Sequence, residues 1–429
     1  MNGWNGQRPR WVGLLLLRDE PATTAHRVRG RISKRMADHV EQSNPATPRQ
    51  LHVVTPRPAR VHQDHHDESP LRTAELGSMD LELGGRLDQV TLAYRTWGQL
   101  NAAGDNAVLV VHALTGDSLA AGDGGWWSPL IGSGRAIDTD QAFVVCANVL
   151  GGCQGSTGPA TIDPLTGRAF GMRFPLITVG DIVTAQRRLV EQLGVTRLIA
   201  IGGSIGGFQA LEWATRHPDL VSASVPVAAT GALDPQGIAI NEAACRAIMA
   251  DPNWRGGAYA ADGVFPEQGL TIARMLGMVT YHSKESMEMR FGRNPATRPS
   301  ILPSFGPTFD VEGYLHYHGA ALVRRFDANS YLYLTRAMDL YDVGRNGGEE
   351  VWLDRVTAPM LLVGIRSDWL FPPEPIRALA DRLAACGKDA SYVELDSPHG
   401  HDAFLKEWTL MTEAIGPFIE RALAGAGTR

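Results

Sequence analysis

The 429-residue sequence predicts an α/β fold in which a mostly parallel, doubly wound sheet carries an inserted helical cap. Three observations predict this architecture. Continuous apolar runs without alternation recur along the chain, which is typical of parallel strands covered on both faces. Segments with helical spacing separate these runs, as expected for right-handed strand-helix-strand crossovers. One long stretch in the second half of the chain has helical character and no convincing strand run.

Residues 1–70 precede this pattern and are predicted to form a disordered extension. They hold many prolines, six of the thirteen histidines and no sustained apolar period. A solvated tail explains the cluster His62, His65 and His66 better than a designed metal site does. The first apolar run, residues 11–17, is far shorter than the ~20 residues that a membrane span needs.

The first part of the predicted core, residues 71–230, contains the early strands of the sheet and the helices between them. Residues 181–193 carry apolar side chains at helical spacing, and a second helix is expected at 208–216. Apolar runs rich in β-branched residues and bounded by turn residues predict the strands. In this part of the chain they are 90–96, 107–113, 142–149, 198–202 and 221–229.

Residues 231–354 interrupt the alternation of strands and helices. Methionine, arginine and aromatic residues are mixed here at helix-like spacing, as in IARMLGMVTYHS and SYLYLTRAMDLYDV. Strand-like runs resume at 359–364 and 390–395, which predicts that residues 355–429 return to the core. We therefore expect a helical lid inserted above the sheet rather than a separate C-terminal domain.

Composition narrows the class of protein. A formal net charge of -6 without a basic stripe in the folded region disfavours nucleic acid as a partner. The four cysteines have no paired spacing, so neither a disulfide framework nor a zinc site is indicated, and a reducing cytoplasm fits best. No metal or nucleotide motif calls for a resident cofactor, and no membrane partner is expected.

The stretch IAIGGSIGGF, residues 199–208, follows a predicted strand and has two interpretations. A dinucleotide-binding loop needs GxGxxG after the first strand and an acidic residue about twenty positions later, and neither condition is met. Gly202, Ser204 and Gly206 instead satisfy GxSxG, in which the serine occupies a strained turn between a strand and a helix. The motif predicts that Ser204 is a nucleophile.

A serine nucleophile needs a base and an acid that orients the base, in the chain order Ser, Asp or Glu, His for this architecture. Asp368 is the only acidic residue between Arg355 and Glu374, just after a late strand, so it is the expected acid. After the last strand, PHGHDAF offers His399 and His401, and spacing alone does not decide between them.

Two main-chain N–H groups are expected to stabilise the oxyanion of the reaction. One belongs to Ile205, directly after the nucleophile. The other should come from the loop after an early strand, here HALTG, where Leu114 is the candidate. Because main-chain groups donate these bonds, the side chains at both positions carry little information.

Several blocks together resemble one family of acyltransferases. They read HALTGDS, WWSPLIGSGRAIDTD, CANVLGGCQGSTGPATIDPLTG, GGSIGGFQALEWA, ARMLGMVTYHS, FDANSYLYLTRAMD and GHDAFL. From about Leu71 to the C-terminus the chain resembles the homoserine O-acetyltransferases, acyltransferases of methionine biosynthesis with the α/β-hydrolase fold. The resemblance implies that the nucleophile is Ser204, the acid Asp368 and the base His401. It also implies a homodimer and acetyl-CoA as a co-substrate.

The resemblance further implies that Arg274, Tyr281 and Asp402 bind the amino-acid substrate. Homoserine carries a carboxylate and an ammonium, so a site for it should present one fixed cation and one fixed anion near the base. Arg274 would hold the carboxylate and Asp402 the ammonium.

Two departures from the family pattern keep other substrates open. Ile205 stands where the family commonly has methionine, and Leu119 follows GDS where histidine is frequent. Succinyl-CoA as donor and serine as acceptor therefore remain alternatives. A serine esterase is the alternative of another class, since it would share the three catalytic residues but would not need Arg274 with Asp402.

Overall fold

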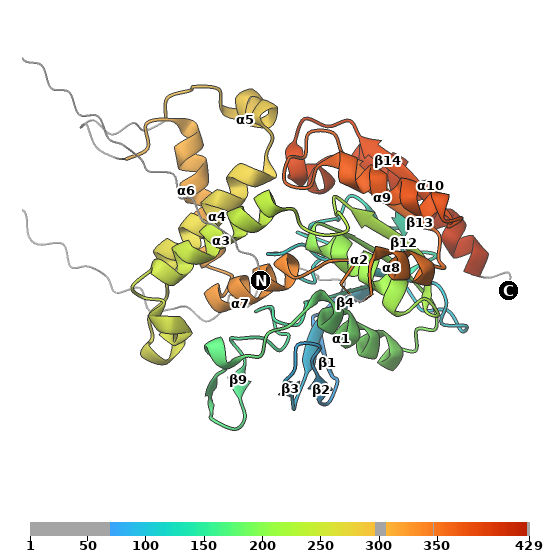
Figure 1. The fold of residues 1–429 in the computed structure, drawn as a ribbon, viewed down its shortest axis with the longest axis horizontal. Helices are drawn as coiled ribbons and strands as arrows, with labels where there is room; N and C mark the ends of the chain where they lie inside the picture. Colours follow the sequence, from blue (N-terminus) through green and yellow to red (C-terminus); the bar gives the residue numbers. More distant parts are fainter. Residues whose placement is uncertain (1–68, 297–305, 346, 427–429) are drawn as a thin grey trace, which may run out of the picture. The chain divides into compact units, whose positions relative to one another are not determined.

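The computed structural model describes residues 69–296, 306–345 and 347–426. The disordered extension predicted for residues 1–70 lies outside these residues except for its last two positions. The predicted α/β fold is confirmed, because an eight-stranded, mostly parallel sheet forms the core (Figure 1).

The sheet has the strand order β1-β4-β8-β5-β11-β12-β13-β14. Five consecutive pairs from β8 to β14 are parallel, whereas β4 is antiparallel to both of its neighbours. The strands are β1 (Arg72–Glu75), β4 (Thr91–Trp97), β5 (Ala107–Val111), β8 (Phe143–Ala147), β11 (Leu198–Gly203), β12 (Val221–Val227), β13 (Met360–Ile365) and β14 (Ala390–Leu395). Three pairs of two-residue strands lie outside the sheet: β2 (Met79–Asp80) with β3 (Arg86–Leu87), β6 (Ile131–Gly132) with β7 (Ile137–Asp138), and β9 (Ile162–Asp163) with β10 (Arg168–Ala169).

Helices cover both faces of the sheet, which explains the continuous apolar runs. In β5, Leu109 and Val111 face one core and Val108 and Val110 face the other, because successive side chains of a strand point to opposite sides. The first core also contains residues of α1 (Val179–Gln192), α2 (Ile205–Arg216) and α9 (Pro373–Ala385), and the second contains residues of α10 (Trp408–Ala426). Both faces are therefore apolar along the whole strand.

The N-terminus of α1 shows why sequence spacing placed one boundary two residues late. Thr178 accepts a hydrogen bond from the main-chain N–H of Asp181, and the Asp181 carboxylate accepts one from the N–H of Thr178. This reciprocal capping box starts the helix at Val179, before the first apolar position of the periodic pattern.

The helical segment, defined as residues 231–354, contains no strand among its described residues. Its helices are α3 (Pro235–Ala250), η2 (Arg255–Gly257), η3 (Tyr259–Asp262), α4 (Glu267–Tyr281), α5 (Lys284–Phe291), α6 (Asp310–Val323), α7 (Ala328–Asp339) and α8 (Glu349–Arg355), the last of which ends one residue beyond it. Helix α4 packs against α3 and α6, and this group is drawn to the left of the sheet in Figure 1. The remaining short helices are η1 (Gly171–Arg173) and η4 (Gly400–Leu405).

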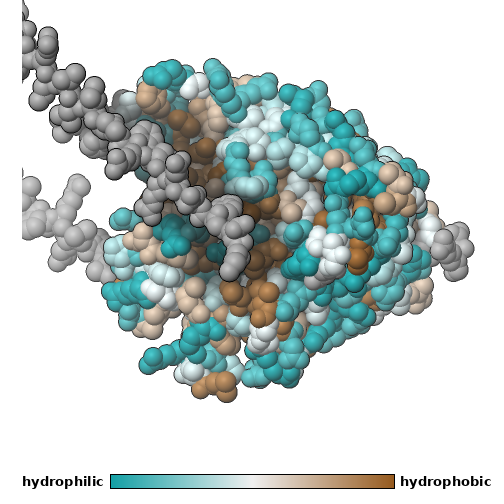
Figure 2. Space-filling view, in the orientation of Figure 1, coloured by the Kyte–Doolittle hydropathy of each residue, from teal (hydrophilic) through white to brown (hydrophobic). Residues whose placement is uncertain are grey.

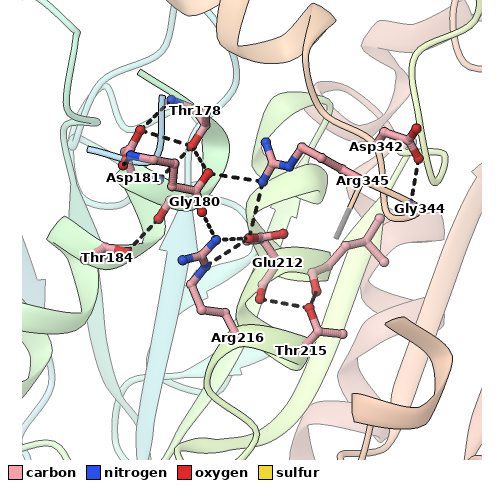
Figure 3. A network of polar contacts seen from close by, with 12 residues as sticks. Thr178, Gly180, Asp181, Thr184, Glu212, Thr215, Arg216, Asp342, Gly344 and Arg345 are labelled. Atoms are coloured by element: carbon pink, nitrogen blue, oxygen red, sulfur yellow. Dashed lines mark hydrogen bonds and ion pairs between the residues drawn. The ribbon is translucent and has the colours of Figure 1, made fainter. Parts of the chain in front are cut away.

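A network of ion pairs ties the end of the helical segment to the core (Figure 3). Arg345 lies 3.2 Å from a carboxylate oxygen of Glu82 and 3.9 Å from one of Glu212. Arg216 pairs with the same two carboxylates. Because all four side chains are at least three-quarters buried, each charge has its partner where water is scarce.

On the face shown in Figure 2, hydrophilic residues cover much of the surface and hydrophobic residues gather toward the middle of the view. Within the described part of the chain, no helix combines the length and the hydrophobicity required to span a membrane.

Candidate active site

Ser204 occupies a strained turn at the carboxyl end of β11. Its φ of 62° and ψ of -127° are unusual for a residue with a side chain, and they place it directly before α2. A Cβ atom added at Gly202 or at Gly206 would lie 2.4 Å from the carbonyl oxygen of Val111. Only glycine fits on either side of this serine, which is the physical reason for the GxSxG pattern.

Asp368 and His401 form a buried pair. His401 Nδ1 lies 2.6 Å from Asp368 Oδ2, and the two side chains are 3% and 0% exposed. The other carboxylate oxygen accepts hydrogen bonds from the main-chain N–H groups of Leu370 and Phe371, both at 2.9 Å. The carboxylate is therefore held in one orientation, and it orients the imidazole in turn.

His399, the other candidate base, points elsewhere. Its Nδ1 lies 3.4 Å from the hydroxyl of Ser286, and its Nε2 lies 3.6 Å from Glu407. Among the described residues, the structure thus pairs Asp368 with His401 and not with His399.

His401 lies against the wall of the pocket that contains Ser204. Its ring stacks on Phe371 at 4.9 Å between centroids and meets the edge of Phe404 at 5.6 Å. A Cβ at Gly203 would touch the same Phe404 ring at 2.5 Å, so this ring fills the space between β11 and the histidine.

His401 Nε2 is buried and has no hydrogen-bond partner among the described residues. The bond from the Ser204 hydroxyl that a relay requires is therefore not formed in this structure. Catalytic hydrogen bonds of this kind are often long without substrate and tighten when substrate binds. A buried nitrogen without a partner is nevertheless costly, and it is the atom that a proton acceptor needs to keep free.

A narrow pocket reaches Ser204, which is only 7% exposed. Side chains from the core and from the helical segment line it together. They are Leu114, Ser204, Leu233, Ile240, Asn241, Ala244, Gly277, Thr280, Tyr281, Tyr331, Met338, Leu370 and Phe371. The lining is mostly apolar, as is typical of small-molecule sites with a few polar groups that set orientation.

Of the two predicted oxyanion donors, Leu114 lines this pocket and Ile205 directly follows Ser204. Ile205 is the first residue of α2, where main-chain N–H groups have no partner within the helix. Leu114 lines the pocket in the loop after β5. Their roles stay predictions.

His112 holds the Leu114 loop in place, and sequence reasoning missed it. Its Nδ1 donates to the carbonyl oxygen of Ala113 at 2.8 Å, and its Nε2 accepts from the N–H of Val149 at 3.1 Å. Burial lowers the pKa of His112, consistent with this neutral tautomer. The imidazole therefore links the loops after β5 and β8.

Arg274 and Tyr281 both lie on α4, but only Tyr281 lines the pocket. The guanidinium carbon of Arg274 is 5.6 Å from the centre of the Tyr281 ring, which in turn is 6.0 Å from the imidazole of His401. Arg274 also donates a weak hydrogen bond of 3.4 Å to the hydroxyl of Thr115. Burial raises the pKa of the Tyr281 phenol, so the group stays a neutral hydrogen-bond donor.

Asp402 follows His401 in η4 and already has a cationic partner. Lys406 Nζ lies 3.4 Å from Asp402 Oδ2. Burial lowers the pKa of Lys406, and the Asp402 carboxylate opposes this change. An ammonium group that binds Asp402 would share the carboxylate with Lys406, an arrangement that the local sequence did not reveal.

The turn before His401 packs against the end of α4. A Cβ at Gly400 would lie 2.5 Å from the main-chain nitrogen of Ser283 and 2.8 Å from the carbonyl oxygen of Tyr281. Gly400 has a φ of +70°, so glycine satisfies both the turn and the close approach.

Within the described parts of the chain, no group of three or more His, Cys, Asp or Glu side chains is arranged to hold a metal ion.

Comparison with known proteins agrees with this geometry. The family model described as the alpha/beta hydrolase fold matches residues 106–407. A protein of Symbiobacterium thermophilum named homoserine O-acetyltransferase is 53% identical over 350 residues, covering 79% of this chain and 91% of the relative. A protein of the same name from Moorella thermoacetica is 49% identical over 352 residues, covering 80% of this chain and 93% of the relative.

Solved structures give two further likenesses. The crystal structure of homoserine O-acetyltransferase from Bacillus anthracis has a TM-score of 0.77 at 28% identity, covering 82% of this chain and 98% of that one. The crystal structure of esterase E22 has a TM-score of 0.75 at 27% identity, covering 82% of this chain and all of that one. On the identity and coverage of these relatives, the chain belongs to the homoserine O-acetyltransferase family of enzymes with the α/β-hydrolase fold.

Proposed function

We propose that the protein transfers an acetyl group from acetyl-CoA to the side-chain hydroxyl of L-homoserine. The observation that carries this proposal is the identity of about one half to relatives of that name, over nine-tenths of their length. The pocket at Ser204 and the buried Asp368–His401 pair support it, because acyl transfer through a serine needs these groups.

The first half of the reaction loads the enzyme. His401 Nε2 takes the proton of the Ser204 hydroxyl while the oxygen attacks the thioester carbonyl. The N–H groups of Leu114 and Ile205 receive the oxyanion, a contribution of about 3 to 4 kcal/mol for each such donor. Collapse of the tetrahedral intermediate breaks the carbon–sulfur bond, and CoA leaves as its thiol with the proton from His401. An acetyl ester of Ser204 remains.

The second half transfers the acetyl group to the amino acid. His401 now takes the proton of the homoserine hydroxyl, and the alkoxide oxygen attacks the ester carbon. The intermediate collapses with loss of the Ser204 oxygen, which recovers its proton from His401. Arg274 and Asp402 orient the acceptor by its carboxylate and its ammonium.

Water competes with homoserine for the same ester and is far more concentrated. We propose that the helical segment acts as a lid, because its residues Leu233, Gly277 and Tyr331 line the pocket around Ser204. Exclusion of water, together with an effective molarity of roughly 10⁵ M for a well-oriented hydroxyl, favours transfer over hydrolysis. Acetyl-CoA enters as a co-substrate, and the homodimer and the cytoplasmic location expected from the sequence stay predictions.

A second candidate function is ester hydrolysis. The likeness to esterase E22, nearly equal in TM-score to that of the acetyltransferase, favours it specifically. The same Ser204 ester would then be released by water, and the acceptor residues would have no role.

Release of CoA from acetyl-CoA separates the two candidates. It is measured with and without L-homoserine, and again with serine as acceptor and with succinyl-CoA as donor. The transferase predicts fast release only with acetyl-CoA and homoserine together, with O-acetylhomoserine formed in equal amount. Equal release with and without an acceptor overturns the proposal in favour of hydrolysis.

A further inference from the structure

Two arginines from different parts of the helical segment converge on Thr115. Arg325 follows α6, and its Nη1 donates to the carbonyl oxygen of Thr115 at 2.7 Å. Arg274 Nη1 lies 3.4 Å from the hydroxyl of the same residue. Thr115 directly follows Leu114, which lines the Ser204 pocket, so both guanidinium groups lie beside the proposed oxyanion loop.

Neither guanidinium has an acidic partner in the parts of the chain that the structure describes. Among the described residues, no carboxylate oxygen lies within 4.0 Å of Arg274 or Arg325. Some other arginines of the helical segment do have one, such as Arg345 with Glu82 at 3.2 Å and Arg336 with Asp339 at 3.9 Å. Two cations that share one neighbour without a counter-ion form a site suited to an anion.

The electrostatics of this pair point the same way. Burial lowers the pKa of Arg325, and the charge of Arg274 lowers it further, while Asp117 opposes the change. The two guanidinium groups therefore repel each other across Thr115. An anion that binds both would relieve this repulsion and would gain charge-assisted hydrogen bonds from each.

The main chain around Arg325 is fixed to the core before any ligand binds. Gln154 donates from its side-chain amide to the carbonyl oxygen of Arg325 at 2.6 Å. Two residues later, the N–H of Asp327 lies 3.3 Å from the sulfur of Cys153. Because the loop after β8 holds this segment, little main-chain ordering is needed for Arg325 to act on a ligand.

We propose that Arg325 binds the carboxylate of the amino-acid acceptor together with Arg274. The inference rests on the proposed function and adds a second cation to the acceptor site. A carboxylate fits the position better than a phosphate of CoA does. A short carbon chain separates the carboxylate of the acceptor from its reacting hydroxyl, whereas the whole pantetheine arm separates the phosphates from the thioester.

The bond from Arg325 to Thr115 gives the acceptor a direct connection to the oxyanion loop. When the carboxylate binds, Arg325 is held between it and the main chain next to Leu114. The acceptor would thus steady the loop that stabilises its own transition state, and an acceptor without a carboxylate would lose this contribution.

The test compares Arg325→Met with Arg324→Met, which makes the same change at the adjacent arginine; both side chains are exposed, but only that of Arg325 bonds to Thr115. Steady-state rates are measured with acetyl-CoA and either L-homoserine or homoserine amide, which lacks the carboxylate. We expect Arg325→Met to raise the KM for homoserine roughly 10- to 100-fold and to leave the KM for acetyl-CoA unchanged. With homoserine amide, the variant and the unaltered protein should react equally, and Arg324→Met should match the unaltered protein throughout.

Each other outcome is decisive. An unchanged KM for homoserine in Arg325→Met overturns the inference, and so does an equal loss with homoserine amide, which indicates a structural role. A raised KM for acetyl-CoA assigns Arg325 to the phosphates, and a loss confined to succinyl-CoA assigns it to an acyl carboxylate. If Arg325→Met does not fold, Arg325→Lys replaces it, with a smaller rise in KM expected for homoserine alone.

The unaltered protein tests the proposed function separately in the same assays. If it does not acetylate homoserine at all, the proposed function fails whatever the variants do. If it does and Arg325→Met behaves identically, only the inference about Arg325 fails.

Discussion

Replacement of Asp368 by asparagine should abolish most of the acyl transfer while leaving the fold intact. Aspartate and asparagine side chains have nearly the same shape, and the Asp368 side chain is fully buried. The carboxylate oxygen that accepts from the N–H groups of Leu370 and Phe371 must remain an oxygen, because both neighbours are donors. The amide nitrogen is thus forced into the position of Oδ2, 2.6 Å from His401 Nδ1.

This geometry places the imidazole proton on the wrong nitrogen for catalysis. An amide N–H that faces Nδ1 requires that nitrogen to accept, so the imidazole proton moves to Nε2. An imidazole with its proton on Nε2 cannot take the proton of Ser204. In a serine protease of the same chemistry, the same exchange lowers kcat about 10⁴-fold, which corresponds to about 5.4 kcal/mol of activation free energy.

The assay follows CoA release from acetyl-CoA in the presence of homoserine, and thermal unfolding shows whether the variant is folded. Asp396→Asn is the matched control, because it makes the same chemical change directly after β14, the strand that pairs with β13. Its side chain is 83% exposed and pairs with Arg366 at the surface. The control should keep its rate within about twofold, as surface ion pairs contribute little. A folded Asp368→Asn variant that loses less than tenfold would refute the orienting role of Asp368.

Three further predictions concern the base, the ion-pair network and the response to acid. His401→Ala should abolish turnover in the same CoA-release assay, while His399→Ala should keep most of it. The reverse result would show that His399, and not His401, is the base. Arg345→Met should lose about 1 kcal/mol of stability, or about 2–4 °C in a calorimetric melting temperature, because Glu82 loses a partner; an unchanged melting temperature would show that the pair contributes nothing. Burial first, and then nearby arginines, lower the pKa of His217 from 6.5 to about 4. The unfolded chain therefore takes up this proton at a higher pH than the folded one, so the free energy of unfolding should fall as pH drops from about 6.5 to about 4. Denaturant titrations should show a smaller fall in His217→Gln, and an identical fall would exclude this group as a source.

The sequence predicted the strands that are buried on both faces, because burial leaves a continuous apolar run. Strand β5, whose five residues are all buried, begins at the predicted residue 107. The last strand, 390–395, lies at an edge of the sheet and is mostly half-buried, and it also has the same bounds in the structure as in the prediction. Strand β1 was not predicted, because it lies at the edge of the sheet, is mostly exposed and has the sequence RTAE, which contains no apolar run. The two-residue strands carry no periodic signal, since their existence depends on pairing partners rather than on local composition.

In the site, too, features set by neighbouring residues could be predicted, and contacts between distant residues could not. The turn at Ser204 could be predicted because the glycines that a strained turn requires lie within a few residues of the serine in the sequence. Lys406 is four residues after Asp402, yet their ion pair could not be predicted without knowing where the two side chains point. The approach of Arg325 to Thr115 joins residues 210 positions apart, and no spacing rule within the chain predicts it.

The most direct test of the account is the covalent state of Ser204 during turnover. The protein is mixed with acetyl-CoA, quenched and digested, and the peptide that contains Ser204 is weighed by mass spectrometry before and after a chase with homoserine. We expect one acetyl group on Ser204 that disappears in the chase as O-acetylhomoserine forms. Product formation without an acetyl group on this peptide, or with the label on another residue, would contradict it.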